Sequence, residues 1–244
     1  MADELSGRIA LVTGASSGIG ASTARALATD GANVALSARR EERLTELADE
    51  LEADYGVETL VVPADVREEE AVESVVADTV DRFGKLDITV VNAGLGRGSG
   101  VDISTEEYRT MMDTNVDGAF FTTRAVLPHL RETTGNLIFV GSFAGKFPRP
   151  ANPVYAATKW WLRGFAHSVE AAVGEDGVGI SVVNPTEVRT EFGSEIDEAF
   201  EDRFDPGEVT EPEEIADAIA FAAKQTNSTV SELDLYRRDK FSGW

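Results

Sequence analysis

The chain has 244 residues, no cysteine, and a formal net charge of −22 from 44 acidic and 22 basic side chains. Without cysteine neither a disulfide framework nor a thiolate metal site can form, and so negative a surface repels nucleic acid and anionic membranes. We expect no metal, no nucleic-acid partner and no membrane partner. The acidic N-terminus and the lack of a membrane-length apolar run predict a cytoplasmic protein.

The acidic side chains recur along the whole chain, as at Glu41-Glu42, Glu68-Glu69-Glu70 and Glu213-Glu214. Only five of the 22 basic residues are lysine. Such a surface repels itself in dilute buffer, and salt relieves the repulsion. We interpret the composition as halophilic. The alternative is an acidic protein from a mesophile.

The stretch 8–20, RIALVTGASSGIG, passes from an apolar run into a glycine turn, and helix formers follow it. A helix N-terminus after such a turn attracts a phosphate, because its free N–H groups and the helix dipole favour an anion. Gly14 suits the tight turn, Gly18 the approach of a ligand, and Gly20 close packing of helix and strand. The spacing G-x-x-x-G-x-G differs from the commoner G-x-G-x-x-G. A glycine turn that binds nothing is the alternative.

Strands and helices are expected to alternate along the rest of the chain. Further strands are expected at 34–36, 59–62, 86–91, 136–140, 178–183 and 230–235, and helices at 41–55, 68–82, 105–131, 153–173 and after a capping box that begins at Thr210. This alternation predicts an α/β fold: a Rossmann-type, doubly wound parallel sheet of about seven strands with helices on both faces. We expect one domain over 1–244, with a mobile substrate loop at about 185–208. Ligands of such sheets bind at the carboxyl ends of the strands.

Tyr155 and Lys159 lie one helical turn apart on one face of the helix expected at 153–173. A phenol with its ordinary pKa of about 10 is a poor base near neutrality, but a nearby cation lowers that pKa. Ser142 follows the strand at 136–140 and could hydrogen-bond a substrate oxygen beside Tyr155. Together these groups can move a proton on and off an alcohol while a cofactor carries the hydride. Taken alone, the Tyr-x-x-x-Lys spacing also fits a structural pair.

With these motifs the chain resembles the short-chain dehydrogenase/reductase family. The resemblance rests on TGASSGIG at 13–20, Asp65-Val66, Asn92-Ala93-Gly94, Asn115, Ser142, YAATK at 155–159 and Asn184-Pro185. It implies that Tyr155 is the general acid/base and that Lys159 lowers its pKa and binds the nicotinamide ribose. It also implies that Ser142 orients the substrate oxygen and that Asn115 holds a water of the proton relay.

The resemblance implies a nicotinamide dinucleotide as cofactor. The residues expected to bind it are Gly14, Ser16, Ser17, Gly18, Ile19, Gly20, Arg39, Asp65, Val66, Asn92, Ala93, Gly94, Tyr155, Lys159, Pro185, Thr186, Val188 and Thr190. Asp65 and Val66 would border the adenine, Asn92 its ribose, and the Thr190 hydroxyl the carboxamide. The chain departs from the family pattern at Val91, which replaces an asparagine, and at Thr186, which replaces a glycine. The second departure puts the course of the backbone beside the nicotinamide in question.

The cofactor is expected to be NADP(H). Ala38 stands where an NAD site needs an acidic side chain for the ribose 2′-hydroxyl. Arg39 has a planar guanidinium suited to a phosphate or to stacking on adenine, and Ser16 and Ser37 could add hydroxyl donors. The alternative is that Arg39 and Arg40 only open the next helix on its solvent side.

We therefore predict an NADP-dependent oxidoreductase that interconverts a small secondary alcohol, such as a hydroxy acid or a sugar, and its carbonyl. A catalytically silent NADP-binding sensor of the same fold is the alternative, because a fold alone does not give a function. A sugar-nucleotide epimerase or dehydratase would need a longer C-terminal region. The sequence at 232–244 resembles family members that act on 3-hydroxy acids and serine.

Three further groups of side chains bear on substrate binding, metal binding and assembly. Arg97, Arg149 and Arg189 could bind a substrate carboxylate if they face the cleft. His129 and His167 lie in separate helices without ligand partners, which favours no metal site. Phe120-Phe121 and Trp160-Trp161 lie on helices that pair between subunits in this family, so we expect a homodimer or homotetramer.

The acidic surface predicts that salt stabilises the folded chain. As KCl rises from dilute buffer into the molar range, screening relieves the self-repulsion and the melting temperature should rise. Differential scanning calorimetry across a KCl series measures the change. A melting temperature that is the same in dilute buffer and in molar KCl would contradict the halophilic interpretation.

Overall fold

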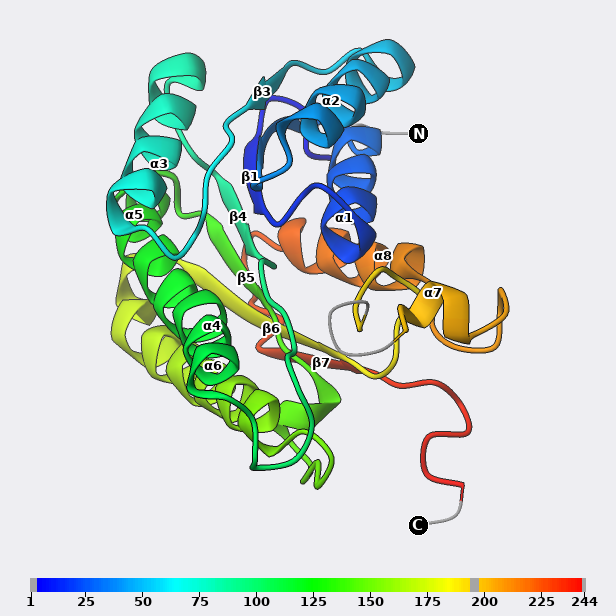
Figure 1. Cartoon of the computed structure of the whole chain (residues 1–244). Helices are drawn as coiled ribbons and strands as arrows, with labels where there is room; N and C mark the ends of the chain where they lie inside the picture. Colours follow the sequence, from blue (N-terminus) through cyan, green and yellow to red (C-terminus); the bar gives the residue numbers. More distant parts are fainter. Residues whose placement is uncertain (1–3, 194–197, 243–244) are drawn as a thin grey trace.

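The structure, a computed structural model, describes residues 4–193 and 198–242. Within these residues one parallel sheet has the strand order β3-β2-β1-β4-β5-β6-β7 (Figure 1). The strands are β1 (Ile9–Thr13), β2 (Asn33–Ser37), β3 (Thr59–Val61), β4 (Ile88–Val91), β5 (Asn136–Val140), β6 (Gly179–Pro185) and β7 (Glu232–Leu235). The sheet confirms the predicted Rossmann-type fold and its seven strands.

Apolar runs form the central strands because both faces of the sheet are covered. In β1, Ala10 and Val12 pack into one core cluster and Leu11 packs into the other. Successive side chains of a strand point to opposite faces, so a strand covered on both sides needs apolar residues at every position. The whole of β1 and the whole of β5 are buried.

Helices cover both faces of the sheet. On one side lie α1 (Gly18–Thr29), α2 (Glu41–Tyr55) and α8 (Pro212–Ala223), and on the other α3 (Glu69–Phe83), α4 (Thr105–Met112), α5 (Gly118–Thr133) and α6 (Pro153–Val173) (Figure 1). A short helix, α7 (Phe200–Arg203), lies in the expected substrate loop, of which residues 194–197 lie outside the described part. No helix in the described part is long and apolar enough to cross a membrane.

The expected helix at 105–131 is interrupted, which the apolar spacing did not indicate. A π-helical turn, η1 (Asp113–Asp117), separates α4 from α5. Such a turn holds one extra residue, and it is often found at functional sites. Two short 3₁₀ turns, η2 (Phe143–Gly145) and η3 (Gly174–Asp176), were also not predicted.

The predicted capping box of α8 was displaced by one residue. The cap is Glu211, which forms the reciprocal bonds with Glu214, and Pro212 occupies the first turn. Thr210 instead pairs in parallel with Val188, and its carbonyl accepts a hydrogen bond from the Arg189 N–H at 3.0 Å. This pairing holds Thr210 extended and ties the loop after β6 to the start of α8.

Candidate functional site

A cavity of about 510 Å³ opens where the carboxyl ends of β1, β2, β4, β5 and β6 meet. This volume is in the range of small-molecule and cofactor sites. The predicted site residues in its wall are Gly14, Ser16, Ser17, Gly18, Ile19, Arg39, Asp65, Val66, Asn92, Ala93, Gly94, Ser142, Tyr155, Lys159, Pro185, Thr186, Val188 and Thr190. Gly20 and Asn115 are the two predicted residues that do not line it.

The glycine turn at one end of the cavity leaves the start of α1 open. Gly14 and Gly18 have φ values of +67° and +52°, which glycine adopts readily. The N-cap, Ser17, makes no side-chain cap bond, so the first N–H groups of α1 lack a partner of that kind. Gly20 supports the turn from behind, because a Cβ there would lie 2.2 Å from the Gly14 carbonyl oxygen.

Arg40 is the arginine that contacts the glycine turn. Its Nη2 donates to the Ser16 and Ser17 hydroxyls at 3.0 and 2.7 Å, and its Nη1 donates to Glu191 at 2.8 Å. Arg39, the arginine predicted to bind the cofactor, also lines the cavity. The two consecutive arginines after β2 are the sequence feature that indicates a role for Arg40 at the cavity. No sequence feature indicates the role of Glu191.

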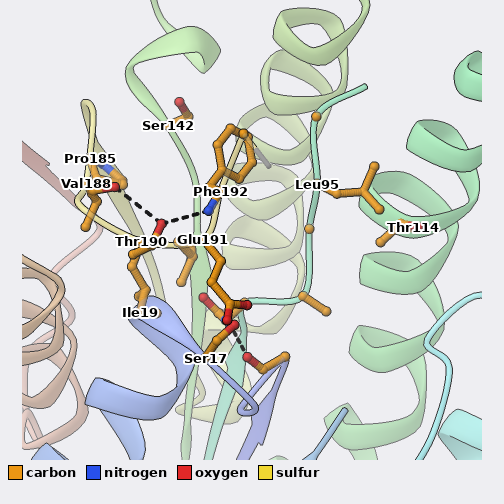
Figure 2. A pocket seen from close by; sticks show the side chains of 18 of the residues that line it. Ser17, Ile19, Leu95, Thr114, Ser142, Pro185, Val188, Thr190, Glu191 and Phe192 are labelled. Carbon is orange, nitrogen blue, oxygen red and sulfur yellow. Dashed lines mark hydrogen bonds between the residues drawn. The ribbon is translucent and has the colours of Figure 1, made fainter. Parts of the chain in front are cut away.

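Glu191 closes this end of the cavity from the loop after β6. Partial burial acts to raise its pKa, but hydrogen bonds from Arg43 and Arg40 outweigh burial and lower the pKa of Glu191 to about 2. In Figure 2 the Glu191 side chain extends toward Ser17, while Ser142 and the Phe192 ring lie at the other end. The ion pairs therefore join the loop after β6 to the region between β2 and α2.

Asn92 and Thr190 make internal hydrogen bonds at the cavity wall. The Asn92 Nδ2 donates to the carbonyls of Thr13 and Gly14, at 2.9 and 3.1 Å, and so ties the end of β4 to the glycine turn. The Thr190 hydroxyl donates to the Val188 carbonyl at 3.3 Å and accepts from the Phe192 N–H at 3.2 Å (Figure 2). Both side chains stabilise the wall, and their expected contacts with a cofactor remain predictions.

Ser142, Tyr155 and Lys159 meet at the other end of the cavity. The Ser142 hydroxyl caps η2 by accepting the Ala144 N–H at 3.1 Å. The Lys159 ammonium donates to the Val140 carbonyl at 2.8 Å and lies 5.9 Å from the centre of the Tyr155 ring. The end of β5 and the first turns of α6 therefore bring the three predicted groups to one place.

Burial controls the protonation of this group. It raises the pKa of Tyr155, against the opposing influence of the Ser142 hydroxyl and the Arg149 guanidinium. The net shift is upward because desolvation dominates, and Ser142 and Arg149 act in the opposite direction. The expected effect of Lys159 on this pKa remains a prediction. Burial also lowers the pKa of Lys159 to about 8. Both side chains are thus shifted toward their neutral forms.

Asn115 lies behind the cavity in η1. Its Oδ1 accepts the Leu95 N–H at 2.9 Å, and its Nδ2 donates to the Leu95 carbonyl and the Thr158 hydroxyl at 2.8 and 3.1 Å. The side chain therefore fastens the loop after β4 to α6. This makes Asn115 a positioning residue in the structure, and its expected role in a water relay remains a prediction.

The two departures from the family pattern have simple structural consequences. Val91 is buried in the core cluster beneath α5 and α6, so it changes the packing. Thr186 accepts the Arg237 N–H on its hydroxyl at 3.0 Å, and its own N–H donates to the Leu235 carbonyl at 3.2 Å. Thr186 thereby anchors the segment after β7. It lacks a positive φ, since Thr134 is the only described non-glycine residue that has one.

The three arginines that are candidates for binding a substrate carboxylate differ in their position relative to the cavity. Arg149 lines the cavity, and Arg97 and Arg189 do not. Arg189 is paired with Glu211 at 3.0 Å. His129 and His167 also lie outside the cavity wall, and His167 contacts Glu170 at 3.3 Å.

Comparison with known proteins agrees with this geometry. The model of the short chain dehydrogenase family matches residues 8–201. Sulfoacetaldehyde reductase 2 of Chromohalobacter salexigens is 40% identical over 188 residues, which are 75% of this chain and 74% of that protein.

Solved structures show the same fold. An alcohol dehydrogenase of the archaeon Thermococcus sibiricus, complexed with 5-hydroxy-NADP, has a TM-score of 0.86 and 34% identity, with 93% of this chain and 95% of that chain covered. A 3-ketoacyl-(acyl-carrier-protein) reductase of Brucella melitensis, complexed with NADH, has a TM-score of 0.85 and 29% identity, with 95% and 98% covered. These relatives carry different nicotinamide cofactors.

The lowered pKa of Lys159 predicts a pH-dependent stability. Below about pH 8 the folded chain holds a buried ammonium, and between about 8 and 10.4 the unfolded chain binds more protons than the folded one. The free energy of unfolding of the parent, relative to Lys159→Met, should therefore rise from pH 7 to pH 10 by on the order of 2 kcal/mol.

Urea unfolding of both proteins at the two pH values measures this difference. Lys85→Met is the control, because the Lys85 side chain is 43% exposed. The same pH response in the two methionine variants would show that burial does not disfavour the Lys159 ammonium.

Proposed function

The chain belongs to the short-chain dehydrogenase family, and from this premise we propose that it is an NADP(H)-dependent oxidoreductase that interconverts a secondary alcohol and its carbonyl. One observation carries the proposal. A phenol, a serine hydroxyl and a buried lysine, from Tyr155, Ser142 and Lys159, share a cavity with a glycine turn and the pair of arginines after β2.

The cavity wall fits a phosphorylated dinucleotide. Gly18 faces Thr190, and a Cβ on Gly18 would lie 2.9 Å from the Thr190 Cγ2, so the glycine keeps this approach open. At the end of β2, Ala38 offers no acceptor for a ribose 2′-hydroxyl, and Arg39 and Arg40 offer guanidinium donors. We propose that these arginines hold the 2′-phosphate and that the open N–H groups of α1 hold the diphosphate.

The reaction assigns a distinct task to each side chain. NADP(H), when bound, supplies or accepts the hydride. Tyr155 is protonated near neutral pH, since burial raises its pKa above the already high ordinary value, so it is suited to donate its proton to a carbonyl oxygen. Ser142 hydrogen-bonds the same oxygen and positions it. In the reverse direction the phenolate accepts the proton of the alcohol.

Lys159 completes the proposed site through its charge. Its ammonium is buried beside the phenol and is held by the Val140 carbonyl. In this position it would bind the hydroxyls of the nicotinamide ribose and stabilise the phenolate that forms when Tyr155 gives up its proton. Asn115 supports this arrangement by fastening Leu95 to α6.

A silent dinucleotide sensor is the competing proposal, and the polar residues argue against it. A binding protein can use the glycine turn, the arginines and Lys159, but it does not need a buried phenol that shares the cavity with a serine hydroxyl. The relatives named above are reductases and a dehydrogenase. We therefore favour the enzyme.

Assembly and salt adaptation are also part of the proposal. Phe120 on α5 and Trp160 on α6 are 39% and 48% exposed, which supports pairing of these helices in a homodimer or homotetramer. Surface cations such as Arg131, which pairs with Asp176, are half as numerous as the acids, so the chain keeps a net charge of −22. This surplus supports the halophilic interpretation.

Tyr155→Phe should abolish most of the turnover. The change removes only the phenol oxygen, so cofactor binding should survive while kcat falls by about 10²–10⁴-fold. NADPH absorbance measures turnover and a fluorescence titration measures binding. Tyr108→Phe is the matched control, because Tyr108 lies on α4 outside the cavity wall. Activity of Tyr155→Phe within about tenfold of the parent would remove the phenol from the mechanism.

Cofactor choice should depend on the end of β2. The parent should prefer NADP(H) over NAD(H), since a charge-assisted bond to phosphate contributes about 10–100-fold. Ala38→Asp with Arg39→Leu should shift the preference toward NAD(H), and Arg40→Leu should weaken the use of NADP(H). The measured quantity is kcat/KM with each cofactor. A parent that prefers NAD(H), or a double variant with unchanged preference, would show that these residues do not select the cofactor.

A further inference from the structure

A group of cations surrounds Glu187 at the Tyr155 end of the cavity. Glu187 follows β6, and its two carboxylate oxygens accept hydrogen bonds from the Lys240 ammonium at 2.6 and 2.8 Å. An Arg149 Nη2 lies 3.6 Å from the carboxylate, and the Arg237 Nε lies 4.0 Å from it. We call Arg149, Arg237 and Lys240 the cationic cluster.

Positive charge exceeds negative charge at this place. Glu187 is the carboxylate that the three cations share, and Asp239, 3.1 Å from Arg237, is an exposed second one. Lys240 occupies both Glu187 oxygens, so the carboxylate is already neutralised. In a chain with twice as many acids as bases, a local surplus of cations in a cavity wall requires an explanation.

Arg149 is the member of the cluster with unused donors at the cavity. It lines the cavity together with Ser142 and Tyr155. Its distance to Glu187 is longer than a hydrogen bond, and within the described residues its guanidinium donates no hydrogen bond. Arg149 and Tyr155 thus face the same cavity, and the positive charge of Arg149 acts to lower the pKa of the phenol.

Aromatic side chains lie beside the cationic cluster. The Phe143 ring lies 5.8 Å from the Arg149 guanidinium and 4.7 Å from the Lys240 ammonium. Phe143 itself stacks on Phe147 at 4.4 Å. Aromatic rings attract cations, so Phe143 helps to hold Arg149 and Lys240 in place. The Lys240 side chain is buried, while the Arg149 side chain is 37% exposed and open to a ligand.

We propose that Arg149 binds a carboxylate or sulfonate group of the substrate, so that the preferred substrates are short anionic hydroxy or oxo compounds. This inference rests on the oxidoreductase function proposed above. The guanidinium fork matches the paired oxygens of both groups. Because Lys240 already neutralises Glu187, the anion meets no repulsion from that carboxylate.

The test compares substrates that differ only in charge. Acetoacetate and its neutral methyl ester are reduced with NADPH by the parent, Arg149→Met and Arg149→Lys, at one fixed KCl concentration. The parent should have a kcat/KM at least about tenfold higher for the acid, and Arg149→Met should lower the acid-to-ester ratio about 30-fold. Arg149→Lys should retain part of the ratio, because it keeps the charge and loses the fork.

Two controls separate recognition from other effects. Arg131→Met removes an arginine that pairs with Asp176 on the surface, and it should leave the acid-to-ester ratio unchanged. The ester corrects for any effect of Arg149 on the pKa of Tyr155, since both substrates use the same phenol. A third substrate, 2-oxopropane-1-sulfonate, shows whether the site prefers a sulfonate to the carboxylate.

Several results would overturn the proposal. An ester reduced as well as the acid by the parent, or a ratio that Arg149→Met leaves unchanged, contradicts it. If neither compound is reduced, the NADP⁺ complex is titrated calorimetrically with acetoacetate and with the sulfonate. Binding that Arg149→Met abolishes supports the proposal. The absence of binding to the parent overturns it. A failure of the oxidoreductase function is distinct, since no carbonyl would then show turnover that depends on Tyr155.

Discussion

The cavity depends on the close approach of the start of α1 to the ends of β1 and β4. Gly14 and Gly20 make this approach possible, because a Cβ on Gly20 would lie 2.2 Å from the Gly14 carbonyl oxygen and 2.6 Å from the Asn92 Nδ2. Asn92 in turn hydrogen-bonds the carbonyls of Thr13 and Gly14, which the turn would otherwise leave unpaired. The N–H groups at the start of α1 are thereby presented to the cavity.

At the end of the cavity that holds Tyr155 and Lys159, desolvation determines the direction of the pKa shifts. Burial raises the pKa of Tyr155 and lowers the pKa of Lys159, so both side chains are biased toward neutrality on one turn of α6. In the proposed reaction, a protonated phenol is suited to the direction that adds a proton to a carbonyl oxygen. The Lys159 ammonium, 5.9 Å from the centre of the Tyr155 ring, is proposed to stabilise the phenolate that then forms.

The sequence predicts those parts of the molecule that local patterns determine. Apolar runs place the strands, since a doubly covered sheet buries every position, and the glycine, serine, tyrosine and lysine motifs place eighteen of the predicted residues in one cavity wall. The π-helical turn that holds Asn115 is not predicted, because the 105–131 stretch predicts one continuous helix. The cap of α8 moves from Thr210 to Glu211 because a distant strand-like pair with Val188 holds Thr210 extended.

Contacts between residues far apart in the chain cannot be predicted from local sequence patterns. The contacts of Arg40 with Ser16 and Glu191 join three separate segments, and the cationic cluster joins Arg149 to residues of the C-terminal segment. The direction of the Tyr155 pKa shift depends on burial, which only the folded chain determines. For the same reason only the structure shows that Arg149 lines the same cavity as Tyr155.

Hydride transfer within this cavity is the central claim, and isotope transfer tests it most directly. The protein is incubated with NADPH deuterated at one face of C4, and then at the other, together with acetoacetate and its methyl ester, and the alcohol product is analysed by mass spectrometry. The account predicts one deuterium on the new carbinol carbon, transferred from one face of the cofactor only, and a loss of this transfer in Tyr155→Phe. Bound NADPH that transfers deuterium from neither face, to these compounds or to any of a panel of aldehydes, ketones, sugars and oxo acids, would contradict the account and indicate a silent dinucleotide-binding protein.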